Sequence, residues 1–284
     1  MRDHKNAASP VTEELPQATM SPEQEHIAIA IERYVVAATI PILYDADSVA
    51  DQVGTGTLFT LAGRYFLVTA QHTFHNRDAG RFAIPKSRIT GDLHSLGPHQ
   101  LLSADSEEAD IDIAILELLD EFTISYSKSE WKSLTLNDIV RPSSTGMFVL
   151  CGYPSLYAMR KEGLITGKPA TAITNRIPIP TNADPPINPA LDLFFRYGPG
   201  ASDLSDKNVS VPPLRGVSGA SVWEYREPEN TTVWAPAGCL RAVGVETSFR
   251  EGSYFRAKSW EMVLEMLRRW DSGLRDAIND KWEF

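Results

Sequence analysis

The chain has 284 residues, of which 43% are hydrophobic and 23% are charged, and its formal net charge is -10 at pH 7. This composition supplies enough apolar side chains for a sizeable core and is typical of a globular protein. An acidic chain lacks the basic surface that binds nucleic acid or an anionic membrane, so we expect neither as a partner.

The first 20 residues are polar, contain proline and lack the apolar stretch of a secretory signal. We expect residues 1–20 to form a disordered tail. Nowhere does an uninterrupted apolar run approach the roughly 20 residues of a membrane-spanning helix. The sequence therefore predicts a cytoplasmic protein that does not cross a membrane.

A helix is expected directly after this tail. Ser21 is a typical N-cap, Pro22 fits the first helical position and Gln24 completes a capping box. Apolar side chains continue the pattern through Tyr34. Pro41 ends any continuation, because proline lacks the N–H that a helix needs.

Short strand-like segments, separated by Gly, Pro and Asp, follow from residue 39 onward. Residues 54–61 and 64–69 flank a glycine turn and predict a β-hairpin. Many short strands without alternating long helices favour an antiparallel barrel or sandwich over a doubly wound sheet. The further expected strands are Ile40–Tyr44, Ile111–Leu118, Met147–Cys151, Leu191–Tyr197, Ala220–Tyr225 and Leu240–Glu246.

Two long stretches carry little regular pattern. Residues 75–109 contain few strand signals, and residues 176–190 are too rich in proline for a helix. Each stretch is either a functional loop or a surface insertion, and the two alternatives stay open.

The carboxy-terminal segment predicts an amphipathic helix. Trp260, Val263, Leu267 and Trp270 recur at the spacing of one apolar helical face, and Gly273 is a candidate break. We expect this face to pack on the protein's own barrel, with binding to a partner as the alternative.

Cysteine and histidine usage limits the chemistry. Cys151 and Cys239 are expected to be reduced, buried thiols, although a single disulfide stays open because their proximity cannot be read from the sequence. His72 and His75 lack the Cys, His or carboxylate partners of a zinc site. The sequence therefore predicts no metal and no cofactor.

Three short segments hold a histidine, an aspartate and a serine in the order of a known catalytic triad. In such a triad His72 takes the Ser218 proton, and Asp112 holds the imidazole tautomer. The backbone N–H groups of Gly216 and Ser218 would form the oxyanion hole. Acyl transfer, above all peptide hydrolysis, is the favoured chemistry. The segments are Val68-Thr69-Ala70-Gln71-His72, Asp112-Ile113-Ala114-Ile115-Leu116 and Gly216-Val217-Ser218-Gly219.

Each segment alone is weak evidence, and their joint occurrence in this order beside strands is what supports the interpretation. Asp110 is an alternative to Asp112, but Asp112 directly precedes the Ile-Ala-Ile-Leu strand and is the expected partner of His72. An α/β-hydrolase would need the serine first and the histidine last, so this order argues against that class.

These segments resemble the catalytic blocks of the chymotrypsin/trypsin-like serine proteases, most of all bacterial trypsin-like peptidases without disulfides. The similarity covers roughly residues 38–272. It implies an all-β fold of two six-stranded antiparallel β-barrels, with an N-terminal and a C-terminal helix and the site between the barrels. The matching blocks are Gly54-Thr55-Gly56-Thr57-Leu58-Phe59 with the histidine segment, the aspartate segment, Gly216-Val217-Ser218-Gly219-Ala220-Ser221, and Leu150-Cys151-Gly152-Tyr153-Pro154 at the opening of the second barrel.

The resemblance also implies a domain plan and one departure from the family pattern. The peptidase domain would span residues 21–272, with the N-terminal helix and first barrel in 21–140, the second barrel and C-terminal helix in 141–272, and a C-terminal extension in 273–284. The family usually has an aspartate before the nucleophile, where this chain has Val217. That aspartate pairs with a newly cut N-terminus in zymogens, so activation by N-terminal insertion is not expected.

Substrate-binding residues follow from the same resemblance. The positions before the nucleophile would line the primary pocket and offer no acid at its base, and the strand after residue 244 would pair with the substrate backbone. Thr247 is expected to hydrogen-bond Asp112, and Phe249 to narrow the pocket. The implied substrate-binding residues are Pro212, Pro213, Arg215, Glu246, Thr247, Ser248 and Phe249.

Glu246 has two interpretations. It points into the pocket and favours a basic substrate side chain, or it forms a salt bridge with Arg250 or Arg256. The sequence as a whole predicts a serine endopeptidase acting through an acyl-enzyme on a protein or peptide, regulated inside a bacterial cell, with a regulatory protein as a candidate partner. The alternative is a catalytically silent binding module with the same fold.

Overall fold

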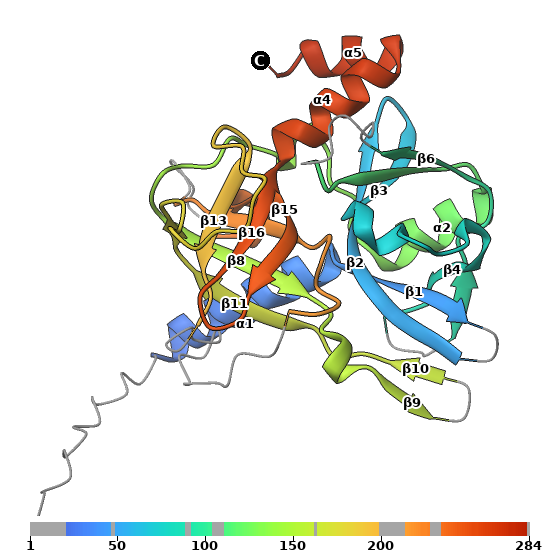
Figure 1. Ribbon diagram of the computed structural model, residues 1–284, viewed down its shortest axis with the longest axis horizontal. Helices are drawn as coiled ribbons and strands as arrows, with labels where there is room; N and C mark the ends of the chain where they lie inside the picture. The colour runs from blue at the N-terminus through green and yellow to red at the C-terminus, as the bar shows by residue number, and fades with distance from the viewer. Residues whose placement is uncertain are drawn as a thin grey trace, which may run out of the picture.

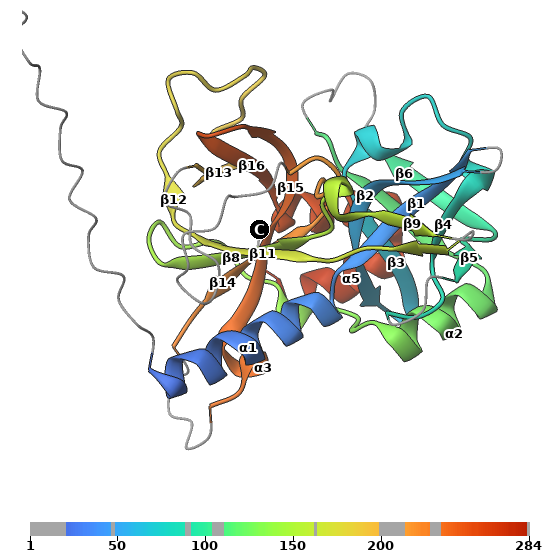
Figure 2. The ribbon, with the colours of Figure 1, turned by 90° about the horizontal axis from the view of Figure 1, so that it is seen from below.

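Two curled antiparallel sheets make up most of the computed structural model. Each sheet has seven strands, and the two lie side by side as half-barrels (Figures 1 and 2). The expected double-barrel architecture is confirmed, but with seven strands in each sheet rather than six, because very short strands complete both sheets. The structure describes residues 21–46, 49–88, 92–103, 111–161, 164–198, 214–227 and 234–282.

The first sheet carries the segments that lead to His72 and Asp112. Its strands lie in the order β5-β4-β1-β2-β3-β7-β6. The expected hairpin is present as β2 and β3, with Ala62 and Gly63 at positive φ in its turn. Strand β3 also pairs with β7, which joins distant parts of the chain. The strands are β1 (Ile40–Ala46), β2 (Val49–Leu61), β3 (Arg64–Thr69), β4 (Phe82–Pro85), β5 (Leu93–Ser95), β6 (His99–Ser103) and β7 (Ala114–Leu118).

The second sheet carries the segment that contains Ser218. Its strands lie in the order β11-β8-β14-β15-β16-β13-β12, and a separate hairpin, β9-β10, projects from it toward the first sheet (Figure 1). The strands are β8 (Met147–Gly152), β9 (Met159–Lys161), β10 (Leu164–Thr166), β11 (Ala170–Thr174), β12 (Arg176–Ile177), β13 (Asp192–Arg196), β14 (Ser221–Tyr225), β15 (Leu240–Arg250) and β16 (Tyr254–Ser259).

Helix α1 (Pro22–Ala37) begins with the predicted capping box. The Ser21 hydroxyl accepts from the Gln24 N–H, and the Gln24 side chain accepts from the Ser21 N–H. The helix packs on the second sheet, where Tyr34 meets Trp223 edge-on with ring centroids 5.8 Å apart (Figure 2). Local sequence thus starts the helix, and an aromatic contact fixes it to the sheet.

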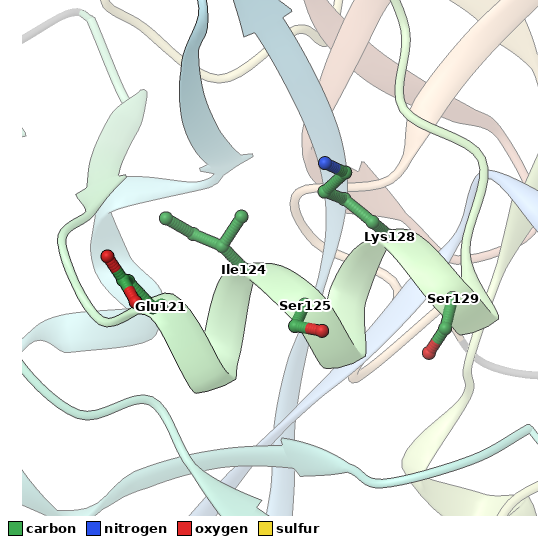
Figure 3. A pocket seen from close by; sticks show the side chains of 5 residues that line it. All are labelled: Glu121, Ile124, Ser125, Lys128 and Ser129. Atoms are coloured by element: carbon green, nitrogen blue, oxygen red, sulfur yellow. The ribbon is translucent and has the colours of Figure 1, made fainter.

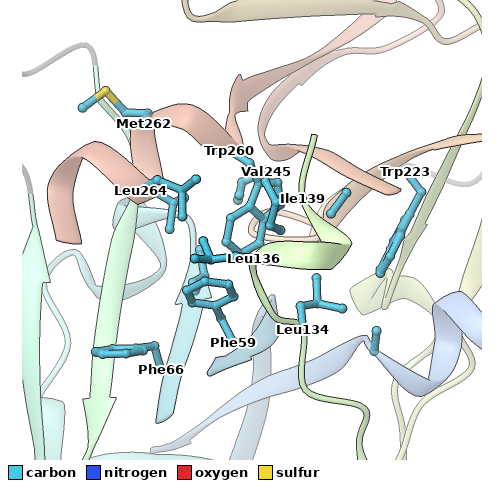
Figure 4. Packing of buried hydrophobic residues seen from close by; sticks show 14 of the residues in the cluster. Phe59, Phe66, Leu134, Leu136, Ile139, Trp223, Val245, Trp260, Met262 and Leu264 are labelled. Atoms are coloured by element: carbon cyan, nitrogen blue, oxygen red, sulfur yellow. The ribbon is translucent and has the colours of Figure 1, made fainter. Parts of the chain in front are cut away.

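The carboxy-terminal helices bridge the two sheets, and Figure 4 shows Trp260 and Leu264 packed in the same buried cluster as Phe59. Helix α4 (Trp260–Trp270) follows directly after β16 of the second sheet. Its Trp260 lies 5.5 Å from Phe59 of β2, and its Trp270 lies 6.3 Å from Phe66 of β3, measured between ring centroids. The expectation that this helix packs on the protein itself is confirmed. Helix α5 (Ser272–Asn279) adds Leu274 and Ile278 to the same core.

Some elements were not expected. Residues 75–109 contain β4, β5 and β6, although they show few strand signals. Helix α2 (Glu121–Glu130) begins at Asp120, whose carboxylate accepts from the Thr123 N–H, and α3 (Pro236–Cys239) is a single turn. The tail of residues 1–20 lies outside the described residues. None of the described helices is long and apolar enough to cross a membrane.

Both cysteines are buried and unpaired. Cys151 lies on β8, and burial raises the pKa of its thiol to about 11. Because the thiolate is the reactive form, this thiol is inert at neutral pH. The expectation of two buried thiols is therefore confirmed.

One ion pair lies entirely inside the second sheet. The Lys258 ammonium of β16 is 2.6 Å from the Asp192 carboxylate of β13, and both side chains are buried. The other Asp192 oxygen accepts from the Asn188 N–H at 2.7 Å. The pair joins β13 to β16, and Asp192 also binds the loop that precedes β13.

Candidate active site

The pairing of β3 with β7 brings His72 next to Asp112. Strand β3 ends at Thr69, opposite Ala114 at the start of β7, so the residues just beyond these strand ends meet. The His72 Nδ1 lies 2.6 Å from Asp112 Oδ2, and the His72 backbone N–H donates to Asp112 Oδ1 at 2.9 Å. Asp112 thus holds both the ring and the backbone of His72.

The turn that carries Ser218 depends on two glycines. Gly216 has φ +92° and Gly219 has φ +94°, a region that side chains with a Cβ rarely adopt. The Val217 N–H donates to the Leu214 carbonyl at 2.8 Å and closes the turn. Ser218, 8% exposed, lies between these two glycines.

This turn packs on the part of the first sheet that precedes His72. The Thr55 N–H donates to the Ser218 carbonyl at 2.8 Å. A Cβ placed on Gly219 would overlap the Thr55 carbonyl and would lie 2.8 Å from the Ala70 nitrogen. The backbone of Ser218 is therefore held against the first sheet. The contact at Ala70 lies two residues before His72 in the sequence.

Two backbone N–H groups of the turn, those of Gly216 and Ser218, are candidates for an oxyanion hole. The Arg215 carbonyl accepts from the Ser155 N–H at 2.8 Å. In a trans peptide the carbonyl and the N–H point in opposite directions, so the Gly216 N–H points away from Ser155. In the described part of the chain neither the Gly216 nor the Ser218 N–H has a hydrogen-bond acceptor. The arrangement is compatible with the predicted oxyanion hole.

Two residues of the first sheet that we did not predict as site residues bind the Gly216 carbonyl group of the nucleophile turn. Thr55 Oγ1 donates to the Gly216 carbonyl at 2.8 Å, and the Gln52 amide donates to the Gly216 carbonyl at 3.3 Å and to the Tyr153 carbonyl. Both side chains are buried. A polar residue inside an apolar strand is the signal that would have marked Thr55, because buried polar groups need partners.

Glu246 is the main departure from the expected substrate-binding residues. Its side chain is fully buried, and it forms no ion pair with Arg250 or Arg256. Burial, followed by the Asp112 carboxylate, raises the pKa of Glu246 to about 8, while Ser218 and Arg256 lower it. Two of the candidate catalytic residues, Asp112 and Ser218, thus influence the pKa of this carboxyl.

The remaining predicted substrate-binding residues have varied positions. Thr247 is buried, and its hydroxyl has no hydrogen-bond partner among the described residues, so the expected bond to Asp112 is not present. The Ser248 hydroxyl accepts from Arg256 at 3.0 Å. Arg215 is exposed and Phe249 is partly buried against the second-sheet core, while Pro212 and Pro213 lie outside the described residues.

Two other features lie away from this site. A shallow surface pocket runs along α2 and is lined by none of the candidate residues (Figure 3). Among the residues that the structure describes, no group of His, Cys, Asp and Glu is arranged to hold a metal ion. The pocket is lined by Glu121, Ile124, Ser125, Lys128 and Ser129.

Comparison with solved structures shows the same architecture in a protease. An inactivated protease paralogue from the scabies mite is 17% identical, covers 84% of this chain and 96% of its own, and superposes with a TM-score of 0.53. The chain has a chymotrypsin-like fold. A thermostable serine protease from an extremophilic microorganism is 10% identical over 86% of this chain and 96% of its own, with a TM-score of 0.47. No protein-family model and no curated protein sequence matches the chain.

Gly219→Ala tests how tightly the nucleophile turn is packed. Gly63 is a matched control, because its φ of +78° is also positive but a Cβ there would meet nothing within 4 Å. Gly63→Ala is expected to lower the free energy of unfolding by about 1 kcal/mol through backbone strain alone. Gly219→Ala is expected to lose about 1–3 kcal/mol more through overpacking against the first sheet. Urea denaturation of both variants measures the difference, and equal losses would contradict the close contact.

Proposed function

We propose that the chain is a serine endopeptidase that uses His72, Asp112 and Ser218 as a catalytic triad. The observation that carries this proposal is the contact between Asp112 and His72, in which both carboxylate oxygens accept from the same residue. A structural histidine does not need its ring nitrogen and its backbone held by one carboxylate. A general base does, because its tautomer and its orientation both have to be set.

The proposed reaction begins at the histidine. Asp112 keeps the proton of His72 on Nδ1, so Nε2 has a free lone pair and takes the proton of Ser218 Oγ. The oxygen then forms a bond to the scissile carbonyl carbon, and the carbonyl electron pair moves onto its oxygen. The N–H groups of Gly216 and Ser218 donate to this oxyanion, and loss of one such donor typically costs about 10²–10³ in rate.

The tetrahedral intermediate collapses to an acyl-enzyme. The bond from carbon to the leaving nitrogen breaks, and that nitrogen takes the proton from His72 Nε2. A water molecule then repeats the sequence: it gives a proton to Nε2, attacks the acyl carbon and releases the carboxylic acid while Ser218 regains its proton. Protein or peptide substrates are proposed, because an endopeptidase site needs only an extended backbone to pair with the strand that contains Thr247.

Regulation is proposed to differ from that of zymogens. Val217 is buried in the apolar cluster of the second sheet, in contact distance of Gly152 on β8. An apolar side chain in this position has no charge to pair with a new N-terminus. We therefore expect no activation by cleavage near the N-terminus, and we place control of activity, with a regulatory protein as the proposed partner, at the site itself.

Covalent labelling with a fluorophosphonate probe tests the function. Wild-type protein is expected to be labelled, and Ser218→Ala and His72→Ala are expected to lose labelling. Ser129→Ala, in an exposed serine on α2, is the matched control and should be labelled like the wild type. Absence of labelling in the wild type between pH 6 and 10 would contradict the proposal.

The second candidate is a binding module without catalysis. Within the described residues no hydrogen bond joins Ser218 to His72, and the scabies mite neighbour is itself described as inactivated. Long catalytic hydrogen bonds are common before substrate binds, so this observation alone does not decide between the two. The labelling experiment does, because a silent module leaves the probe unreacted.

A further inference from the structure

Glu246 is a buried carboxyl that the triad mechanism does not use. It lies on β15, and its backbone pairs with the end of the nucleophile turn: its N–H donates to the Ala220 carbonyl at 2.8 Å, and its carbonyl accepts from the Gly219 N–H at 2.7 Å. The side chain is fully buried, and neither carboxyl oxygen completes a well-aligned hydrogen bond with any residue that the structure describes. Burying a carboxyl group whose oxygens lack hydrogen-bond partners costs folding free energy, so such a group is unusual in a folded protein.

The groups around this carboxyl define what it can do. The Ser218 side chain is close enough to lower its pKa, and the Asp112 carboxylate is close enough to raise it. The positive charge of Arg256 on β16 lowers the pKa of Glu246, and Glu246 raises the pKa of the buried Tyr197, just after β13. The pKa of Tyr197 is raised by burial and then by Glu246, so this phenol is neutral across the working range.

When two carboxyl groups lie at one site, the negative charge of one opposes ionisation of the other and raises its pKa. Asp112 is partly exposed and binds His72, whereas Glu246 is fully buried. Desolvation therefore falls on Glu246, which stays protonated at neutral pH, with a pKa of about 8. A protonated carboxyl is a hydrogen-bond donor, and an ionised carboxylate is an acceptor only.

We propose that Glu246 is a positioning residue for the Ser218 hydroxyl. In its neutral form its O–H donates to Ser218 Oγ, and the Ser218 hydrogen remains directed to His72 Nε2. In its ionised form the carboxylate accepts the Ser218 hydrogen and withdraws it from His72. The inference rests on the proposed peptidase function. It states that protonation of Glu246 decides whether the Ser218 hydroxyl can give its proton to His72.

The pH dependence follows from this exchange. Ionisation begins as the pH approaches 8, so kcat/KM is expected to fall by about tenfold one pH unit above the Glu246 pKa. Glu246→Gln is neutral at every pH, and its amide N–H₂ still donates to Ser218. This variant is expected to lose the decline of kcat/KM at high pH. Glu224→Gln, in a buried carboxyl of the same sheet that pairs with Arg226, is the matched control and should retain the decline.

The experiment measures kcat/KM and the rate of fluorophosphonate labelling between pH 6 and 10 for these three proteins. An identical alkaline decline in the wild type and Glu246→Gln would overturn the role of Glu246. A rate that rises above pH 8 in the wild type would overturn it as well, because a carboxylate would then assist the imidazolium. Loss of cleavage in Glu246→Gln only after Lys or Arg would assign the residue to substrate recognition instead. Unlabelled wild-type protein would contradict the peptidase itself, which separates the two failures.

Thermal unfolding provides a second measurement that does not need activity. The folded-state pKa lies above that of an unfolded glutamate, so between these two values the unfolded chain binds fewer protons and stability falls as the pH rises. The midpoint of Glu246→Gln should therefore exceed that of the wild type at pH 9, and the difference should shrink toward pH 5. A difference that does not change with pH would show that the carboxyl is not buried in its neutral form.

Discussion

Asp112→Asn is expected to lower kcat by about 10⁴, with the fold intact. The asparagine oxygen can still accept from the His72 backbone N–H, so the ring stays near its place. Its amide N–H₂, however, now faces His72 Nδ1 and can only donate. The imidazole then carries its proton on Nε2 and cannot take the proton of Ser218.

Asp110→Asn is the control that the sequence itself offers. Asp110 is two residues away and carries the same charge, but it lies outside the described residues, and it is Asp112 that binds His72. Steady-state kinetics on a peptide substrate should show a large loss for Asp112→Asn and wild-type rates for Asp110→Asn. An equal loss of kcat in both variants, or a loss in Asp110→Asn alone, would show that the contact between Asp112 and His72 does not contribute to catalysis.

Lys258→Met should lower the free energy of unfolding by about 3–5 kcal/mol, because it leaves a charge buried without its partner. The ammonium is 2.6 Å from Asp192, and neither side chain reaches solvent. Methionine replaces the aliphatic part of the lysine well, so the loss reports the orphaned carboxylate rather than a cavity. Urea denaturation at pH 7 measures it.

The double variant Lys258→Met/Asp192→Leu distinguishes the ion pair from packing. Replacing both members of a buried pair with apolar residues is often neutral or stabilising, so most of the loss should be recovered. The Asn188 N–H would still lose its acceptor on Asp192, so the double variant should keep a small loss in the free energy of unfolding. A double variant as unstable as the single one would mean that shape, and not charge, dominates at this position.

Local signals in the sequence predicted what local interactions determine. The capping box of α1 involves residues three apart, and the β2-β3 hairpin is closed by a turn at Ala62 and Gly63, so both were found. Helix α2 was missed because its apolar pattern is weak, although Asp120 is an ordinary N-cap and was a usable signal. Strands β4, β5 and β6 were missed because short strands acquire their stability from neighbours in the sheet.

The candidate site was predictable by residue type and less so by contact. Residue order indicated His72, Asp112 and Ser218, and the structure brings the first two into direct contact and packs the turn of the third beside them. The register of β15 against β16 shifts between Glu246 and Ser248, so Thr247 is the extra residue of a bulge. Such a shift changes which side chains face Asp112 and is set by strand pairing, which no short motif records.

Helix α4 has a consequence for how the protein is made. A ribosome releases the chain in sequence order, and domains begin to fold as they emerge. His72 and Asp112 come out first, Ser218 follows, and only then does Trp260 appear to join Phe59 across the two sheets. The aromatic contact that joins the two sheets therefore forms only after all three residues of the proposed triad have been synthesised.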